Sequence, residues 1–363
     1  MRALRLHAPG DLRMHDEPIP QPGPGEALIQ VRSVGVCASD VHWWRDGGIG
    51  TTVLTDPVVL GHEASGTVVE VGEPAASTGR DVRSRSTDIK PGLRVAIEPA
   101  RPCLACEFCA AGNFNVCPSV LFFGTPPTDG CFRDYVVWPT SLLLPAPDKL
   151  SMDEIAMVEP LAIGIYAVDL AEVRPGETVG VLGAGAIGLS VVQALRLAGA
   201  GRILVSEPVA DRRELAAKLG ADVVCDPVDL QAAAADVTSG RGLDLVFECA
   251  GEPDAVRETS KIARVLGRVM ITGIPRGDDY PFDASTSRRK QITAVFVRRS
   301  NLTTERAMEL TAAGKVDVLS YVTHTFPLER AGEAIELAES KSQGVLRAVV
   351  KVSEEGRGAR SEA

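Results

Sequence analysis

The sequence predicts an α/β protein with two domains, one rich in β-strands and one built on a doubly wound parallel sheet. The chain has 363 residues, which exceeds the roughly 250–300 residues at which a single hydrophobic core stops growing. Residues 1–155 contain short strand-like runs between turns that are rich in Pro and Gly, whereas strands alternate with helices over residues 156–290. Such alternation indicates βαβ units and therefore a parallel sheet.

In the first part, Pro and Gly crowd residues 18–25, and strand-like runs follow at 26–32, 66–72 and 90–97. Residues 73–88 are polar and rich in Ser, Arg and Asp, so we expect an exposed loop there. In the second part, the expected strands cover 179–183, 203–207, 223–225, 243–249 and 267–273, and the expected helices include 186–198, 211–219 and 255–266. The chain then continues with an apolar stretch at 292–297, helices at 304–313 and 329–338, and a strand-like run at 346–352.

Composition excludes several classes of partner. The net charge of −10 is unfavourable for binding nucleic acid or an anionic membrane surface. No apolar run approaches the roughly 18 residues that span a bilayer, and the chain begins with a strand-like stretch instead of a signal peptide. We therefore expect a cytoplasmic protein.

A glycine motif lies between the first strand and the first helix of the second part. Gly183, Gly185 and Gly188 match the pattern G-x-G-x-x-G, with Ile187 before the last glycine. In this strand–turn–helix context the motif predicts dinucleotide binding, because the glycines let the backbone and the helix N-terminus approach the pyrophosphate.

Glu207 follows the last glycine by 19 positions, at the end of the next expected strand. A carboxylate there binds ribose hydroxyls and repels a 2′-phosphate, so NAD is favoured over NADP. Arg212 and Arg213 keep NADP open, since a basic pair could hold that phosphate.

Four of the eight cysteines, Cys103, Cys106, Cys109 and Cys117, have the spacing C-x₂-C-x₂-C-x₇-C. Four thiolates this close can surround one zinc ion in a closed tetrahedral site that stabilises structure. An iron–sulfur cluster or a metal-free thiol loop are the alternatives. A second, dispersed set comprises Cys37, His62 with the adjacent Glu63, and Glu159. One thiolate, one imidazole and one or two carboxylates describe a zinc site with an open position, although the spacing alone is weak evidence.

With both sets in view, the chain resembles the zinc-containing medium-chain alcohol dehydrogenases over nearly its whole length. Within that family it is most similar to the sorbitol (polyol) dehydrogenase branch, through residues 94–99, 125–130, 159–161 and 322–328. The resemblance implies a GroES-like catalytic domain formed by residues 1–155 and completed by 291–363, with a Rossmann domain at 156–290. It also implies two zinc ions per chain, NAD, a small alcohol substrate, and a homotetramer or homodimer.

The resemblance further assigns residues. Cys37 and His62 are implied as ligands of the catalytic zinc, and the choice between Glu63 and Glu159 for the remaining positions stays open. Ser39 corresponds to the hydroxyl that takes the alcohol proton, and His42 to the outer end of that relay, while hydride passes to the nicotinamide. The implied substrate contacts are Trp43, where relatives often carry Tyr, and Phe122, Thr125, Arg298 and Arg299.

The expected function is zinc-dependent oxidation of a secondary alcohol, such as the polyols sorbitol or xylitol, to a ketone. A threonine or simple secondary-alcohol dehydrogenase of the same family is one alternative. A non-catalytic protein that binds zinc and NAD for structure is another, but such a protein would have no need of Ser39 and His42.

Overall fold

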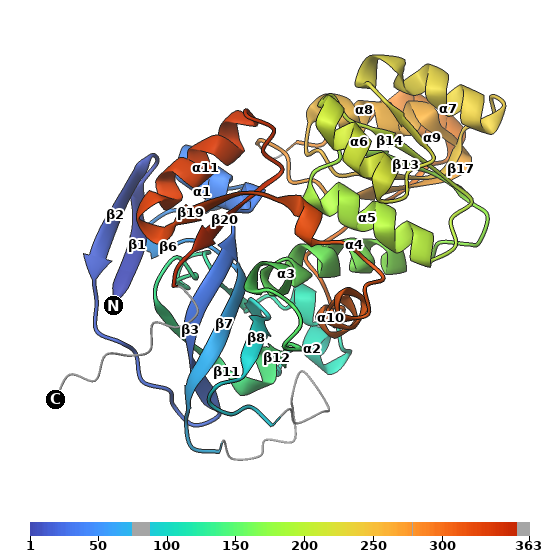
Figure 1. Cartoon of the computed structure of the whole chain (residues 1–363). Helices are drawn as coiled ribbons and strands as arrows, with labels where there is room; N and C mark the ends of the chain where they lie inside the picture. The colour runs from blue at the N-terminus through green and yellow to red at the C-terminus, as the bar shows by residue number, and fades with distance from the viewer. Residues whose placement is uncertain (75–87, 278, 354–363) are drawn as a thin grey trace. The chain divides into compact units, whose positions relative to one another are not determined.

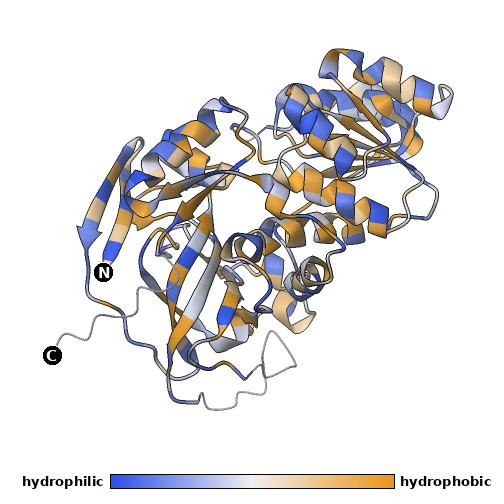
Figure 2. Ribbon diagram, viewed as in Figure 1, coloured by the Kyte–Doolittle hydropathy of each residue, from blue (hydrophilic) through white to orange (hydrophobic). Residues whose placement is uncertain are grey.

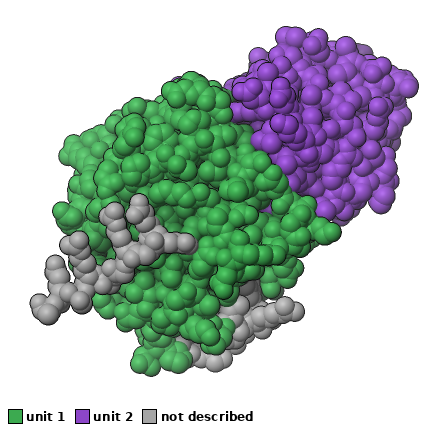
Figure 3. Space-filling model, viewed as in Figure 1, with its two compact units in different colours: residues 1–159, 304–363 green, residues 160–303 purple. Residues whose placement is uncertain are grey.

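The computed structural model describes residues 1–74, 88–277 and 279–353 (Figure 1). The chain divides into two compact units (Figure 3), one made of Met1–Glu159 with Thr304–Ala363 and the other of Pro160–Thr303. No helix among the described residues is long and apolar enough to cross a membrane. The polar segment 73–88 lies almost entirely outside the described residues.

The first unit is built on a seven-stranded sheet with the order β12-β8-β7-β3-β20-β19, in which β11 also pairs with β3. These strands are β3 (Glu26–Gly35), β7 (Glu63–Val71), β8 (Arg94–Ile97), β11 (Tyr135–Pro139), β12 (Leu143–Pro145), β19 (Val322–Pro327) and β20 (Arg347–Lys351). Antiparallel pairing of β20 with β3 brings the end of the chain into the sheet formed by its beginning. A second sheet has the order β2-β1-β6, from β1 (Arg2–Ala8), β2 (Asp11–Asp16) and β6 (Val58–Val59).

Short elements surround these sheets. The short strands are β4 (Gly48–Ile49), β5 (Thr52–Val53), β9 (Ala100–Arg101) and β10 (Leu121–Phe122). The helices are α1 (Ala38–Asp46), α2 (Glu107–Ala110), α3 (Met152–Ala156), α10 (Thr304–Ala312) and α11 (Ala331–Ser340). One apolar core joins the strands to α1 and α11, and Val34, Trp43 and Ile335 are among its fully buried members.

The second unit contains a six-stranded sheet with the order β15-β14-β13-β16-β17-β18, and every pairing in it is parallel. The strands are β13 (Thr178–Leu182), β14 (Arg202–Ser206), β15 (Val223–Cys225), β16 (Leu243–Glu248), β17 (Ala263–Ile271) and β18 (Thr293–Phe296). The helices are α4 (Val158–Leu170), which contains the unit boundary, α5 (Ala186–Leu197), α6 (Ala210–Lys218), α7 (Leu230–Thr238), α8 (Pro253–Ile262) and α9 (Ala284–Lys290). Hydrophobic residues cover α4 (Figure 2), which agrees with its burial.

The chain order fixes where this sheet binds ligands. From β13 the chain runs outward to β14 and β15, then crosses back to β16 on the other side of β13. Strand order therefore reverses between β13 and β16, and doubly wound sheets bind ligands outside the carboxyl ends of the strands at such a point.

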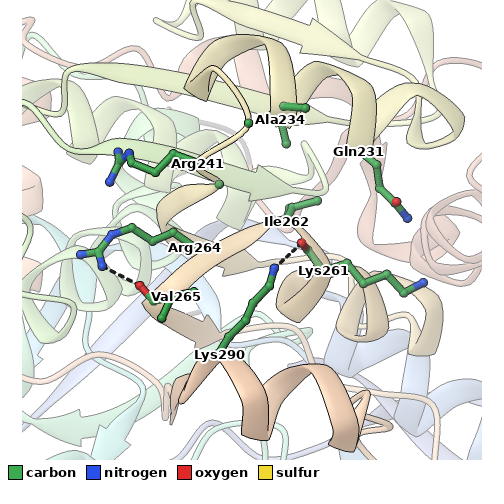
Figure 4. A pocket seen from close by; sticks show the side chains of 11 residues that line it. Gln231, Ala234, Arg241, Lys261, Ile262, Arg264, Val265 and Lys290 are labelled. Atoms are coloured by element: carbon green, nitrogen blue, oxygen red, sulfur yellow. Dashed lines mark hydrogen bonds between the residues drawn. The ribbon is translucent and has the colours of Figure 1, made fainter.

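The helix expected at 255–266 ends earlier than its sequence pattern indicates. Its last residue is Ile262, and Ala263 already pairs with Leu243 in the sheet. Lys290 donates a hydrogen bond to the carbonyl of Lys261 at 2.6 Å (Figure 4) and another to the carbonyl of Ala263 at 2.7 Å. A lysine from α9 thus satisfies the free carbonyls that end a helix, a long-range contact that local periodicity does not contain.

An open hollow of about 340 Å³ lies beside this helix end, and Arg241, Lys261, Arg264 and Lys290 are among its lining residues (Figure 4). Gly242 precedes β16 and Arg264 is near the start of β17. The hollow is therefore at the amino ends of the strands, opposite to the edge at which such sheets bind ligands, and it is not the candidate site.

Candidate metal centres and cofactor site

Strand pairing in the first unit gathers Cys37, His62 and Glu63. Gly35 at the end of β3 pairs with Glu63 at the start of β7, so the residues that follow β3 and precede β7 meet. Cys37 is the N-cap of α1. One ligand atom from each of Cys37, His62 and Glu63 lies within 4.8 Å of the others. This is a thiol, imidazole and carboxylate set that suits zinc.

Asp40, which is 1% exposed, holds the backbone next to Cys37 and His62 in place. Its Oδ2 accepts the N–H of Cys37 at 2.8 Å, and its Oδ1 accepts the N–H of Gly61 at 3.0 Å. Oδ1 also lies 3.8 Å from Nδ1 of His62. One carboxylate therefore positions the backbone beside both the thiol and the imidazole, so Asp40 both completes the capping box at the start of α1 and orients the two side chains.

The centre concentrates buried acidic groups. Glu63 is 0% exposed and Glu159 is 6% exposed. Burial, with the Glu63 charge second, raises the pKa of the Cys37 thiol to about 12. Burial also raises the pKa of Glu159 well above its ordinary range, and Glu63 and Cys37 raise it further while His62 lowers it.

A buried arginine offsets part of this charge. Nη2 of Arg347 lies 3.2 Å from Oε1 of Glu63, and its Nη1 donates to the carbonyl of Val36 at 2.6 Å. Three buried carboxylate oxygens have no hydrogen-bond partner among the described residues: Oε1 and Oε2 of Glu63 and Oε2 of Glu159. Arg347 pairs with Oε1 of Glu63 alone. Because buried carboxylate oxygens without hydrogen-bond partners are costly unless a cation binds them, the residues present fit a zinc ion.

Glu159 lies outside the group whose ligand atoms are mutually close, although its pKa responds to all three members of that group. The geometry therefore favours Glu63 as the third ligand, with Glu159 as a neighbouring carboxylate.

The remaining predicted residues of the first unit lie at different distances from the Cys37, His62 and Glu63 group. The Ser39 side chain hydrogen-bonds Cys37, and the ring of Phe122 lies 5.1 Å from that of His62. The N–H of Thr125 donates to the carbonyl of Phe122 at 3.1 Å. Nδ1 of His42 is 3.4 Å from Oδ2 of Asp46.

Trp43, predicted as a substrate contact, is 2% exposed and packs in the apolar core of its unit. Arg298 and Arg299 belong to the second unit, where Arg298 is exposed and Arg299 has a φ of 54°.

Cys103, Cys106, Cys109 and Cys117 form a second centre. Their sulfurs all lie within 4.8 Å of one another, with Cys103–Cys109 and Cys106–Cys117 both at 4.0 Å. Zn–S bonds of about 2.3 Å in a tetrahedron place the sulfurs roughly 3.8 Å apart, so the cluster fits zinc closely.

Backbone groups support the sulfurs of this second centre. The N–H of Cys109 donates to Cys106 Sγ, and the N–H of Cys103 donates to Cys117 Sγ, both at 3.4 Å. With four sulfurs around the ion, no position remains for substrate.

In the second unit the glycine motif forms the turn between β13 and α5. Gly183 has a φ of 94°, a conformation that favours glycine. A Cβ on Gly188 would lie 1.9 Å from the carbonyl oxygen of Gly183, whereas one on Gly185 would meet nothing within 4 Å. The turn thus requires its first glycine for backbone conformation and its last glycine for packing. Open space remains at the middle glycine, at the start of a helix, where a bound pyrophosphate would lie. Ile187 is half-buried.

The Glu207 side chain is hydrogen-bonded to this turn. Its Oε2 accepts the N–H of Ala184 at 2.8 Å and its Oε1 accepts the N–H of Val209 at 3.0 Å. Arg213 donates to the carbonyls of Glu207 and Pro208 at 2.6 and 2.8 Å. Arg212, beside it on α6, is half-buried.

Two residues of the metal centre were not predicted. Arg347 begins β20 and is followed by the apolar residues Ala348–Val350. Arginine is rarely buried without a partner, so an arginine beside an apolar strand is a sequence signal that could have pointed to a buried ion pair. Gly35 had no such signal: a Cβ there would lie 2.2 Å from Oε2 of Glu63, a contact that only the fold creates.

Comparison with known proteins identifies the class. Residues 23–148 match the family model of the alcohol dehydrogenase GroES-like domain, and residues 186–313 match that of the zinc-binding dehydrogenases. The chain belongs to the zinc-binding, medium-chain dehydrogenases with these two domains. It is therefore an oxidoreductase that acts on CH–OH groups and uses zinc with a nicotinamide cofactor, which confirms the predicted fold class and enzyme class.

Within this class the chain is similar to sorbitol dehydrogenases. It is 38% identical to that of Gallus gallus over 348 residues, with 94% of each chain covered. It is 36% identical to a putative D-xylulose reductase of Rhizobium meliloti over 343 residues, covering 93% of this chain and 95% of that protein.

Among solved structures, an Escherichia coli oxidoreductase of unknown specificity superposes with a TM-score of 0.88 at 34% identity, covering 97% of this chain and 99% of that one. A protein of Sinorhizobium meliloti described as a putative zinc-binding dehydrogenase, solved with NADP, gives a TM-score of 0.84 at 30% identity, with 97% of this chain and 99% of that one covered.

Proposed function

We propose that this protein oxidises a secondary hydroxyl of a polyol to a ketone, with NAD as hydride acceptor. The observation that carries the proposal is the group formed by half-buried Cys37 with buried His62 and Glu63, in which the carboxylate oxygens of Glu63 lack hydrogen-bond partners among the described residues. The names of the relatives, sorbitol dehydrogenase and D-xylulose reductase, favour a polyol over a simple alcohol.

In this proposal each residue has a defined role. Cys37, His62 and Glu63 hold the zinc ion, and Asp40 fixes the backbone beside the first two. A bound zinc ion supplies Lewis acidity that lowers the pKa of the substrate hydroxyl. The Oγ of Ser39, which already contacts Cys37, takes the hydroxyl proton, and the imidazole of His42, in the middle of α1, receives it.

NAD is proposed over NADP on the contacts of Glu207. Its carboxylate is held by Ala184 and Val209 in the turn that receives the pyrophosphate, so a negative charge is fixed beside the adenosine ribose. Arg213 is bonded to main-chain carbonyls and is therefore less available to bind a 2′-phosphate than its sequence position suggested.

Glu207→Ala is expected to lower kcat/KM for NAD by about 10- to 100-fold, because it removes two hydrogen bonds to the turn and those to the ribose. The ratio of NAD to NADP efficiency should fall, since the charge that repels the 2′-phosphate is lost. Steady-state kinetics with both cofactors measure this. Glu214→Ala, an exposed carboxylate on α6, is the matched control, and an unchanged cofactor ratio in Glu207→Ala would contradict the role of Glu207.

A kinetic panel tests the substrate class. Sorbitol, xylitol, threonine and a simple secondary alcohol are each offered with NAD, and we expect the highest kcat/KM for a polyol. Preference for threonine or the simple alcohol would reassign the substrate within the family. Absence of turnover on every substrate, in protein that holds zinc, would support the structural alternative.

We further propose that the protein is a cytoplasmic homodimer or homotetramer. The support for assembly is the outer strand β18, which ends the six-stranded sheet with Thr293 and Ala294 exposed and Phe296 56% exposed. An exposed strand edge is a common site of pairing with a second chain. Light scattering of the purified protein should give a mass of two or four chains, and a monomer would contradict this.

A further inference from the structure

Glu248 is a buried carboxylate that neither the metal centres nor the glycine turn uses. It is the last residue of β16 and is 0% exposed. β16 pairs with β13, so Glu248 lies at the carboxyl edge of the sheet, beside the point where strand order reverses. That edge is where a doubly wound sheet binds its ligand.

Glu248 holds two segments of backbone together, one through its side chain and one through its main-chain carbonyl. Its Oε1 accepts the N–H groups of Ala250 and Gly251, both at 2.8 Å. The main-chain carbonyl of Glu248 accepts the N–H groups of Thr272 and Gly273 at 2.8 and 3.0 Å. Glu248 therefore links the turn after β16 to the end of β17.

These segments pack directly on the glycine turn. The N–H of Cys249 donates to the carbonyl of Leu182 at 2.8 Å. A Cβ on Gly183 would lie 3.0 Å from the nitrogen of Ala250, and one on Gly273 would lie 2.3 Å from the nitrogen of Gly251. With so little space between them, a shift of the turn that Glu248 holds must be transmitted to its neighbours.

The order of the strands indicates which half of the cofactor lies here. Glu207 follows β14, the glycine turn follows β13, and Glu248 ends β16, in that order across the sheet. If the adenosine ribose lies at Glu207 and the pyrophosphate at the turn, the nicotinamide nucleoside lies over β16 and β17. We infer that Glu248 is a positioning residue for the nicotinamide half of the dinucleotide, through the backbone of residues 249–251 and 273; this rests on the proposed use of NAD.

The charge state of Glu248 offers a second readout. Burial raises the pKa of Glu248 to about 7, against the four backbone N–H groups that lower it. The titratable side chain that interacts with it is the Cys249 thiol, whose pKa is raised by burial and by the Glu248 charge, so that this thiol stays neutral. The carboxylate that accepts the backbone N–H groups therefore predominates above about pH 7 and is lost as the pH falls through that value.

The test compares binding of NADH and of ADP, which carries only the adenosine half, by calorimetry. Glu248→Gln keeps the size of the side chain but replaces the charged acceptor of the Ala250 and Gly251 N–H groups with a neutral one, and hydrogen bonds to charged acceptors are the stronger ones. We expect its affinity for NADH to fall about tenfold, and its affinity for ADP to change by less than about twofold. Glu258→Gln, on α8 and bonded to Lys261 and Gln231, is the control and should bind both ligands as the unchanged protein does.

Equal losses for NADH and ADP, or an unchanged affinity for NADH, would overturn the inference. The unchanged protein gives an independent arm if Glu248→Gln does not fold. Its affinity for NADH relative to ADP should fall between about pH 8 and pH 6, and a constant ratio would overturn the inference. Failure of the unchanged protein to bind NADH at any pH would instead contradict the proposed use of NAD.

Discussion

Cys37→Ser is expected to lower kcat/KM for the best polyol by about a thousandfold or more, because it removes the thiolate from a three-residue zinc site, and Lewis-acid stabilisation amounts to several kcal/mol. A serine hydroxyl does not ionise near neutral pH and is not a usual zinc ligand in proteins. The remaining His62 and Glu63 would leave the buried charges of this centre poorly compensated. Metal analysis should find one zinc ion per chain where the unchanged protein holds two.

The matched control is Cys131→Ala. Cys131 is a fully buried thiol outside both metal centres, so this variant should keep both zinc ions and nearly full activity. Retention of activity by Cys37→Ser, with two zinc ions still bound, would contradict the assignment of the catalytic centre. Loss of activity in both variants would point to a general effect of altering buried thiols.

Cys106→Ser is expected to act on stability more than on chemistry. Cys106 caps α2 and lies 4.0 Å from Cys117 in the four-sulfur centre. Binding of a structural zinc ion contributes directly to folding free energy. A loss of about 3 kcal/mol would lower the Tm by roughly 4 °C in a chain of 363 residues, with kcat of the folded fraction near that of the unchanged protein.

Calorimetric unfolding together with metal analysis measures this effect. Cys225→Ala alters a half-buried thiol outside both centres and should leave the zinc content unchanged. An unchanged Tm in Cys106→Ser, or a loss of turnover without a loss of stability, would contradict a purely structural role for this centre.

The four-cysteine centre could be predicted from the sequence more fully than the centre of Cys37, His62 and Glu63. Cys103, Cys106, Cys109 and Cys117 lie within one short segment, and the glycine motif lies within six residues. Local spacing therefore carries most of their geometry. The fold class was predicted for a similar reason, because alternation of strands and helices is a local pattern.

The proposed catalytic centre depends on contacts that no local pattern contains. Cys37 meets His62 and Glu63 because Gly35 pairs with Glu63 in the sheet, and the offsetting charge comes from Arg347 near the end of the chain. From spacing alone the set was weak evidence, and resemblance to a family supplied the residue roles. The end of α8 shows the same limit, because Lys290 closes it from another helix.

The most direct test of the account measures turnover of a polyol with NAD while zinc is removed and restored. Protein with two zinc ions per chain should oxidise the polyol to a ketose and produce NADH. Turnover should disappear when the ion at Cys37, His62 and Glu63 is removed, with the four-cysteine ion still bound, and should return when zinc is added. Equal turnover with and without that ion would contradict the central claim.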